Sequence, residues 1–191
     1  MTQKLTLLFV LLPIQTWIVS SWIKVLDESM SAFRPRTTKT GGLPNLTYLA
    51  RKPEPLGTEF KTVCCGVSGL MVHMEIQRGK DGMKEARYNR SHGATAGCTR
   101  RLAEATNLDE YSRVDIIQGD AWFGSVTAAA ELAYEGRQCC LQVKTNSGLF
   151  PKKFIIDALE GAPGGVNIVL KGDLFVVEYY IHCIHTNISF V

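Results

Sequence analysis

Two short apolar runs that each end on an acid constrain the fold of this chain more than any other feature. The first run is "IKVLD", which ends at Asp27, and the second is "VDIIQGD", which ends at Asp120. An ionised carboxylate at the end of a buried strand is costly unless it is solvated, paired or bound to a cation. One such run would fit a strand-end turn, whereas two of the same form favour a shared metal site.

The sequence around these runs predicts a mixture of strands and helices. The alternation in "TEFKTVCCGVSGLMVHMEIQ" indicates two strands joined by a turn at Gly66–Gly69, after a long loop over 31–57. A helix is expected over 98–106, and "SVTAAAELAYEG" predicts another with Ser125 as N-cap and Gly136 as its stop. A strand "QCCLQVKT", a helix "PKKFIIDALEG" and a strand "VNIVLKG" follow.

The order of these elements predicts an α/β, RNase H-like mixed sheet, in which an antiparallel meander is extended by parallel strands with flanking helices. The strands that end at Asp27 and Asp120 would then lie side by side, about 4.8 Å apart, with both acids facing one point. Mg²⁺, or Mn²⁺ in its place, is the expected cofactor, because it takes oxygen ligands and tolerates one or two carboxylates plus waters and phosphate. Glu28 should point to the opposite face of its strand from Asp27.

Three stretches carry a resemblance to a known family. "VLDESMSAFRPR", "RKPEPLGTEFKTVC" and "GDAWFGSVTAAAEL" together resemble the piggyBac-type transposase domain, over roughly 25–172. The resemblance implies a DDE/DDD transposase fold and metal-dependent cleavage and transfer of DNA strands. It also implies that Asp27 and Asp120 are the first and second catalytic aspartates and metal ligands, while Phe123 and Ser125 match the surrounding motif.

The chain departs from that family at its third catalytic aspartate. Asp173 and Glu178 follow the second acid, but neither has the surroundings that the family's motif requires. The DNA-binding region and the Cys-rich zinc domain that such transposases usually carry also have no counterpart in this sequence. We therefore expect a truncated, inactive derivative that binds metal without turnover. A non-catalytic DNA- or protein-binding derivative and a secreted or membrane-anchored protein are the alternatives.

Basic residues are clustered, although the formal net charge is only +3. DNA is the partner that the resemblance implies, a homodimer is one assembly that it allows, and no small-molecule substrate is expected. Solvated loops and helix faces are the other explanation of such clusters. One stretch runs from Arg34 to Lys61, and a second runs from Arg78 to Arg101. The candidate contacts to the DNA backbone are Arg34, Arg36, Lys39, Arg51, Lys52, Arg100 and Arg101.

The sequence divides into an apolar N-terminal segment (1–23), the transposase-like domain (24–172) and an atypical tail (173–191). The first segment fits a signal or anchor, or alternatively a buried helix and strand. The resemblance implies a nuclear or intracellular location, with secretion or anchoring as the minority alternative. Three glycosylation sequons, at Asn45, Asn89 and Asn187, would matter only in a secreted chain.

The cysteines and aromatic residues give weaker signals. The vicinal pairs Cys64-Cys65 and Cys139-Cys140 lie in predicted strands, where neighbours point to opposite faces, so we expect buried, reduced thiols. The terminal "HCIH" offers a ligand cluster, but its apolar context favours a core strand or a frayed end. Trp122 and Phe123 could stack on an unpaired base, but packing in the core is the favoured interpretation.

Overall fold

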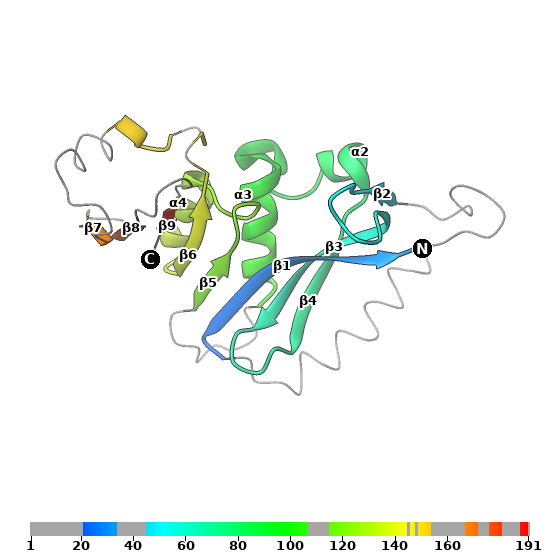
Figure 1. Ribbon diagram of the computed structural model, residues 1–191, viewed down its shortest axis with the longest axis horizontal. Coiled ribbons are helices and arrows are strands. Elements are labelled where there is room, and N and C mark those ends of the chain that lie inside the picture. The colour runs from blue at the N-terminus through cyan, green and yellow to red at the C-terminus, as the bar shows by residue number, and fades with distance from the viewer. Residues whose placement is uncertain are drawn as a thin grey trace.

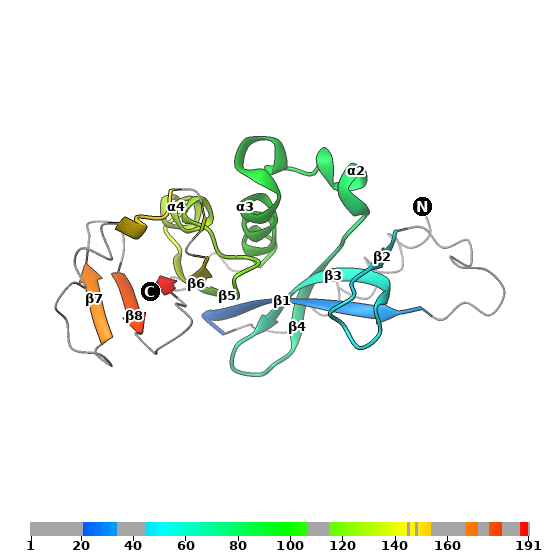
Figure 2. The ribbon, with the colours of Figure 1, turned by 45° about the horizontal axis from the view of Figure 1, so that its top comes forward.

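The computed structural model describes residues 21–33, 45–106, 115–144, 146–147 and 149–153, and the backbone of three further strands at 167–171, 176–180 and 188–190. These residues form one sheet, with helices on one side of its first strands (Figures 1 and 2). The predicted N-terminal segment up to residue 20 and most of the predicted helix at 151–161 lie outside the described residues. No helix in the described part of the chain is long and apolar enough to span a membrane.

The described strands form a sheet in the order β2-β3-β1-β5-β6-β9-β8-β7, with β4 paired to β3. The strands are β1 (Ile23–Ala32), β2 (Leu46–Tyr48), β3 (Leu56–Cys65), β4 (Met71–Ile76), β5 (Ile116–Gly119), β6 (Gln138–Val143), β7 (Asn167–Lys171), β8 (Val176–Tyr180) and β9 (Ile188–Phe190). The helices are α2 (Gly79–Lys84), α3 (Asn89–Glu104) and α4 (Val126–Tyr134).

The pairing of the strands confirms the predicted mixed sheet. β1, β3 and β4 form an antiparallel meander, with the predicted turn between β3 and β4. β5 then pairs with β1 in parallel, and β6 pairs with β5 in parallel. Helix α4 connects β5 to β6, and it begins and ends as the sequence predicts. The Ser125 hydroxyl accepts a hydrogen bond from the Ala128 N–H at 3.0 Å, and Gly136 adopts a left-handed conformation after the helix.

Two local predictions need correction. β1 does not end at Asp27 but continues to Ala32, because its antiparallel pairing with β3 persists as far as Ala32 opposite Gly57. Helix α3 begins at Asn89, nine residues before the predicted start at Cys98, and Gly93 kinks it with a left-handed backbone. The predicted loop over 31–57 therefore begins later, and it contains the short strand β2.

The far side of the sheet differs from a simple continuation of parallel strands. The predicted strand at 166–172 is present as β7, but it pairs antiparallel with β8 at the sheet edge. β9 lies between β8 and β6 and runs antiparallel to both. The parallel arrangement is thus confined to β1, β5 and β6, the strands around the two predicted acids.

The hydrophobic core lies between the sheet and helices α3 and α4. The strands contribute Leu26, Val63, Ile117 and Leu141, all at most 2% exposed. The helices and the turn before α4 add Leu102, Ala103, Phe123, Ala128, Ala129 and Leu132. Burial of these side chains removes apolar surface from water and fixes the register of β1 against β5. The core therefore determines where Asp27 and Asp120 stand relative to each other.

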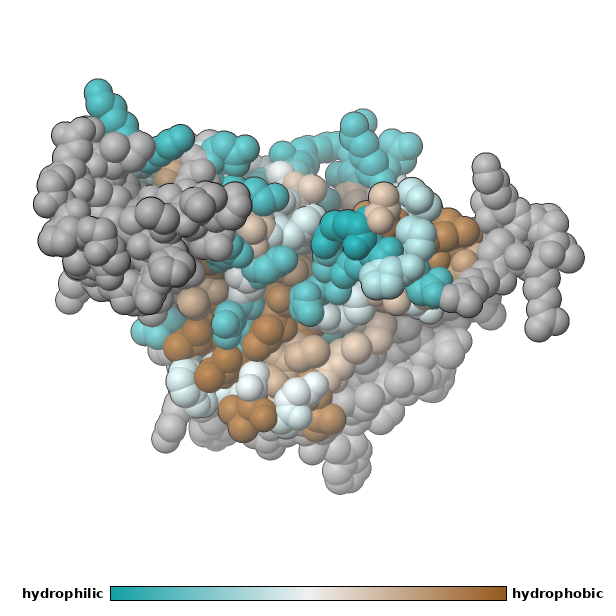
Figure 3. All heavy atoms as spheres, viewed as in Figure 1, coloured by the Kyte–Doolittle hydropathy of each residue, from teal (hydrophilic) through white to brown (hydrophobic). Residues whose placement is uncertain are grey.

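Some apolar side chains remain on the surface, around the turn between β3 and β4. Val67, Leu70 and Met71 are exposed there. Figure 3 shows hydrophobic (brown) surface in the lower part of the molecule. This turn follows the carboxyl end of β3, whereas the loop that carries Arg51 and Lys52 precedes its amino end. Exposed apolar side chains and the exposed side chain of Arg51 therefore lie at opposite ends of this strand.

The described cysteines agree with the predicted state only in part, because Cys64, Cys139 and Cys140 are half-buried and not fully buried as expected. Cys64, Cys65, Cys98, Cys139 and Cys140 are all free thiols, and Cys65 and Cys98 are buried. The vicinal pairs lie in β3 and β6, as predicted. Cys183 and the rest of the "HCIH" motif fall outside the described residues.

Candidate active site

The register between β1 and β5 places the two predicted acids at matching positions. The parallel pairs run from Ile23 opposite Ile116 to Leu26 opposite Gly119. Asp27 and Asp120 are the next residue on each chain after the last of these pairs. Paired residues of neighbouring strands project to the same face of a sheet, so this register predicts that the two carboxylates share a face. Both residues are exposed to solvent.

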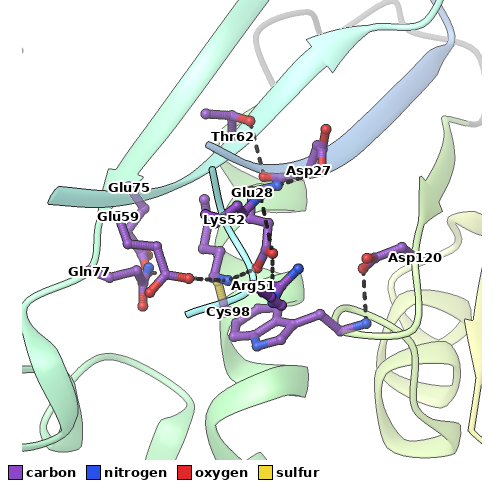
Figure 4. A network of polar contacts seen from close by, with 12 residues as sticks. Asp27, Glu28, Arg51, Lys52, Glu59, Thr62, Glu75, Gln77, Cys98 and Asp120 are labelled. Atoms are coloured by element: carbon purple, nitrogen blue, oxygen red, sulfur yellow. Dashed lines mark hydrogen bonds and ion pairs between the residues drawn. The ribbon is translucent and has the colours of Figure 1, made fainter. Parts of the chain in front are cut away.

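Alternation along β1 separates Asp27 from its neighbours. Lys24, Leu26 and Glu28 are 3%, 2% and 8% exposed and belong to the face that the helices cover, whereas Asp27 is exposed. In Figure 4 the side chains of Asp27 and Glu28 leave β1 in opposite directions. The prediction that Glu28 points away from the face used by Asp27 is therefore confirmed.

Backbone amides orient both carboxylates. The Oδ1 atom of Asp27 accepts a hydrogen bond from the Glu28 N–H at 2.7 Å, and its carbonyl oxygen accepts one from the Thr62 hydroxyl at 3.0 Å. The Oδ1 atom of Asp120 accepts from the Trp122 N–H at 2.9 Å. Neither carboxylate forms an ion pair with another residue in the described part of the chain, so both are available to a ligand from solution.

The turn after Asp120 is anchored in the core. The Asp120 carbonyl accepts hydrogen bonds from the N–H groups of Phe123 and Gly124, at 3.1 and 3.0 Å. Phe123 is fully buried, and the Thr99 hydroxyl of α3 donates to its carbonyl at 2.9 Å. A side chain at Gly124 would have its Cβ 1.9 Å from the Gln142 carbonyl oxygen, so this position requires glycine. The turn thus holds Asp120 in a fixed place above the end of β5.

The favoured interpretation of the two aromatic residues in that turn is correct. Phe123 belongs to the core, and the partly buried Trp122 packs against it edge-to-face, with ring centroids 4.9 Å apart. Both rings therefore contribute to positioning the turn.

Oxygen ligands of this kind suit a hard cation. Two exposed carboxylates at matching positions on neighbouring strands could ligate one Mg²⁺ or Mn²⁺, with waters and phosphate oxygens completing its coordination. No group of three or more His, Cys, Asp or Glu side chains that could hold a metal occurs among the described residues. The residues at hand therefore fit a cation site with an incomplete protein ligand set.

The structure offers little support for a third acid in the tail. β8, which carries Glu178, is separated from β5 by β6 and β9. At about 4.8 Å per strand, its backbone lies roughly 14 Å from β5. Asp173 falls outside the described residues.

A cluster of charged residues around the buried Glu28 and Lys61 lies on the opposite side of β1 from Asp27. Glu28 pairs with Lys61 at 2.9 Å, with Lys52 at 3.5 Å and with Arg51. Lys61 also pairs with Glu59 at 2.6 Å. These ion pairs connect the loop before β3 to the helix-covered face of β1, next to the acid pair (Figure 4).

A second ion pair extends this cluster toward helix α3. The Arg101 guanidinium donates to both carboxylate oxygens of Glu75, at 2.6 and 2.9 Å. Burial by itself would raise the pKa of the Glu75 carboxyl, but hydrogen bonds from Arg101 and its positive charge hold that pKa below its usual value. Burial, with the nearby Glu75 charge, raises the pKa of the Cys98 thiol to about 12, so this thiol stays protonated.

The candidate DNA contacts fall into three groups. Arg34, Arg36 and Lys39 lie outside the described residues. Arg51 and Lys52 pair with Glu28, although Arg51 remains 62% exposed. Arg100 pairs with Glu104, Glu131 and Glu135, and Arg101 with Glu75. The structure thus gives Arg100 and Arg101 a role in holding the helices and the sheet together, and their contact with DNA stays a prediction.

Sequence reasoning missed the buried position of Lys61. It grouped this residue with a basic stretch, but Lys61 is 1% exposed. A signal was present: Lys61 lies in a predicted strand of alternating residues, two positions from Val63 and Glu59, so it shares their face.

Comparisons with known proteins agree with this architecture. In the solved structure of a piggyBac transposase synaptic complex with hairpin DNA, one chain matches with a TM-score of 0.67 at 17% identity, over 90% of this chain and 33% of that one. An endonuclease V from Ciona intestinalis, solved with inosine-containing DNA, matches at 10% identity with a TM-score of 0.36, over 100% of this chain and 82% of that one. A score of that size adds nothing to the assignment of the fold. A search of curated proteins gave no match.

The strand pairing and the structural match define the class of this domain as an RNase H-like fold. A protein-family model described as Transposase IS4 matches residues 14–184, which is most of the chain, so the chain belongs to this piggyBac-type transposase family. It spans about a third of the length of the piggyBac transposase chain that it matches.

Proposed function

We propose that this domain binds duplex DNA through its phosphate backbone, holds a divalent cation between Asp27 and Asp120, and does not by itself cleave the DNA. The observation that carries the proposal is the register of β1 against β5, which brings both exposed acids to matching positions on neighbouring parallel strands. In a complete site of this family, two such ions would together activate a water or a 3′-hydroxyl and stabilise the leaving oxygen.

The proposed absence of turnover rests on the ligand set of the described residues. An in-line displacement of this kind uses two metal ions about 3.5–4 Å apart, and enough anionic ligands to fix both. Asp27 and Asp120 can fix one ion, and the described residues offer no group of three metal ligands. The second ion would be held too loosely to stabilise both the attacking and the leaving oxygen.

The proposal for DNA draws on exposed basic residues and on the relative of similar fold, which was solved with hairpin DNA. Five cations on and beside α2 and at the start of α3 are exposed: Arg78, Lys80, Lys84, Arg87 and Arg90. Cations of this kind displace counterions from the phosphate backbone, so the affinity should fall steeply as the salt concentration rises.

A binding experiment tests this part of the proposal. The purified chain is titrated into fluorescent duplexes of unrelated sequence at a series of salt concentrations. We expect similar affinities for all duplexes, and in a Lys80→Gln/Lys84→Gln variant a salt slope that is smaller by about 1 for each lysine that neutralises a phosphate. An Asp81→Asn variant, which removes an exposed acid from the same helix, is the matched control. Absence of binding at low salt would refute the DNA proposal.

A cleavage experiment tests the catalytic part. The chain is incubated with Mg²⁺ or Mn²⁺ and with supercoiled DNA or duplexes that carry transposon ends. We expect no nicking above the level seen with an Asp27→Asn variant. Metal-dependent nicking that Asp27→Asn abolishes would show that the ligand set is complete after all.

A further inference from the structure

Lys61 is the most deeply buried charged side chain among the described residues, at 1% exposed. It lies in β3 directly opposite Glu28 of β1. An ammonium group at such a position is costly unless its partners are well placed. Its ammonium group reaches from β3 toward both the segment of Asp27 and the segment of Asp120.

The Lys61 ammonium contacts both segments at once. On one side its Nζ atom lies 2.9 Å from Glu28 Oε2, and Glu28 is the residue after Asp27. On the other side the same Nζ atom lies 3.4 Å from the centre of the Trp122 ring. The N–H of Trp122 donates to the carboxylate of Asp120. Glu59 is a further partner, at 2.6 Å.

We propose that Lys61 is a positioning residue for the acid pair of Asp27 and Asp120. Its ammonium links Glu28 to Trp122 on the helix-covered side of the sheet, and this link fixes the spacing of the two acids. The hydrogen bonds of β1 and β5 stop at Leu26 and Gly119, one residue short of the acids. Beyond that point Lys61 provides a side-chain connection between the two segments. This inference rests on the proposed cation site, because only a shared ligand gives the spacing a function.

The expected size of the effect follows from how metal sites depend on supporting groups. Residues that orient metal ligands without touching the metal typically change affinity by about 10- to 100-fold when they are removed. Lys61 acts on both ligands, through the residue after Asp27 and through the N–H that orients Asp120. Its loss should therefore weaken cation binding although neither acid has changed.

The first measurement is the affinity for Mn²⁺ by calorimetry. A Lys61→Met variant keeps the aliphatic stem but leaves Glu59 without its ammonium partner, which could impair folding. A Lys61→Met/Glu59→Gln variant also removes that carboxylate, so any loss of Mn²⁺ affinity in it reports on the position of the acids and not on a folding defect. We expect both to bind Mn²⁺ at least about tenfold more weakly than the unchanged chain. Lys80→Met, at an exposed position on α2, is the control and should bind normally. Unchanged affinity in the stably folded double variant would overturn the inference.

The second measurement needs no metal. Replacing Trp17 and Trp22 by Phe leaves Trp122 as the sole tryptophan, so its emission reports on the cation above its ring. Glu28→Gln should shift this emission when Lys61 is present and should not shift it in the Lys61→Met background. An equal shift in both backgrounds would refute the link. If the unchanged chain binds no Mn²⁺, the cation site fails as a proposal, and the emission result alone decides whether Lys61 connects the two segments.

Discussion

Asp27 and Glu28 are neighbouring acids on one strand, yet their surroundings are opposite. Asp27 is exposed and accepts one backbone hydrogen bond, whereas Glu28 is 8% exposed and pairs with Arg51, Lys52 and Lys61. A buried carboxylate must be neutralised within the chain, but an exposed one is solvated and remains available to a ligand. The comparison indicates that the charges on the helix-covered face of β1 pair within the chain, whereas Asp27 on the opposite face is left accessible to a ligand.

Removal of Lys61 should produce the largest loss of stability. A Lys61→Ala variant leaves the buried Glu28 with only its more exposed partners and Glu59 without its ammonium. We expect the free energy of unfolding to fall by about 3–5 kcal/mol, as is typical when one partner of a buried pair is removed. Urea denaturation followed by circular dichroism measures this. A loss below about 1 kcal/mol would show that the inner cluster is not structural.

The Glu75–Arg101 pair should give the next largest effect, and one that depends on pH. Glu75→Gln should lower the free energy of unfolding at pH 7 by roughly 1.5–3 kcal/mol, because hydrogen bonds to charged groups contribute about that much. The folded state holds the pKa of Glu75 below its ordinary 4.5, so its contribution is complete above pH 4.5 and disappears as the pH falls below it.

Denaturation curves over a range of pH check this prediction. The difference between the unchanged chain and Glu75→Gln should be constant near neutral pH and shrink in acid. Glu85→Gln is the matched control, since the Glu85 side chain is 71% exposed. A difference that stays constant down to pH 3 would contradict the assignment of the effect to this ion pair.

A smaller effect is expected at the start of helix α4. The Ser125 hydroxyl accepts the Ala128 N–H, and loss of an N-cap typically costs about 1 kcal/mol. Ser125→Ala should lower the free energy of unfolding by that amount, whereas Ser125→Asp should retain the stability of the unchanged chain. Equal destabilisation by both variants would argue against capping.

Asp27→Ala should have the smallest effect on stability. Its side chain is exposed, and its described contact is one local hydrogen bond to the next residue, so a change within about 0.5 kcal/mol is expected. A loss comparable to that of Lys61→Ala would remove the distinction between the two faces of β1.

The sequence predicted those features that depend on local pattern. The alternation in β3 and β4, the Ser125 cap and the Gly136 stop all follow from side-chain chemistry within a few residues, and the structure confirms them. The parallel pairing of β1 with β5 followed from the order of the elements.

Features that depend on distant partners were less predictable. β1 continues past Asp27 because β3 supplies hydrogen bonds as far as Ala32, which no local signal reveals. Arg100 looked like a DNA contact because two of the three acids that bind it, Glu131 and Glu135, are distant in sequence. At the acid pair, the sequence identified which residues are candidates, and the structure added the neighbours that orient them.

The affinity for Mn²⁺ tests the central claim, that Asp27 and Asp120 form one cation site, most directly. Calorimetric titration should show one site in the unchanged chain and binding that is at least about tenfold weaker in both Asp27→Asn and Asp120→Asn. The Asp27→Asn/Asp120→Asn double variant should be hardly weaker than either single variant, because neighbouring ligands of one ion are not additive. Asp81→Asn, at an exposed acid on α2, should bind normally. Normal binding in either single variant, or additive losses in the double variant, would contradict a shared site.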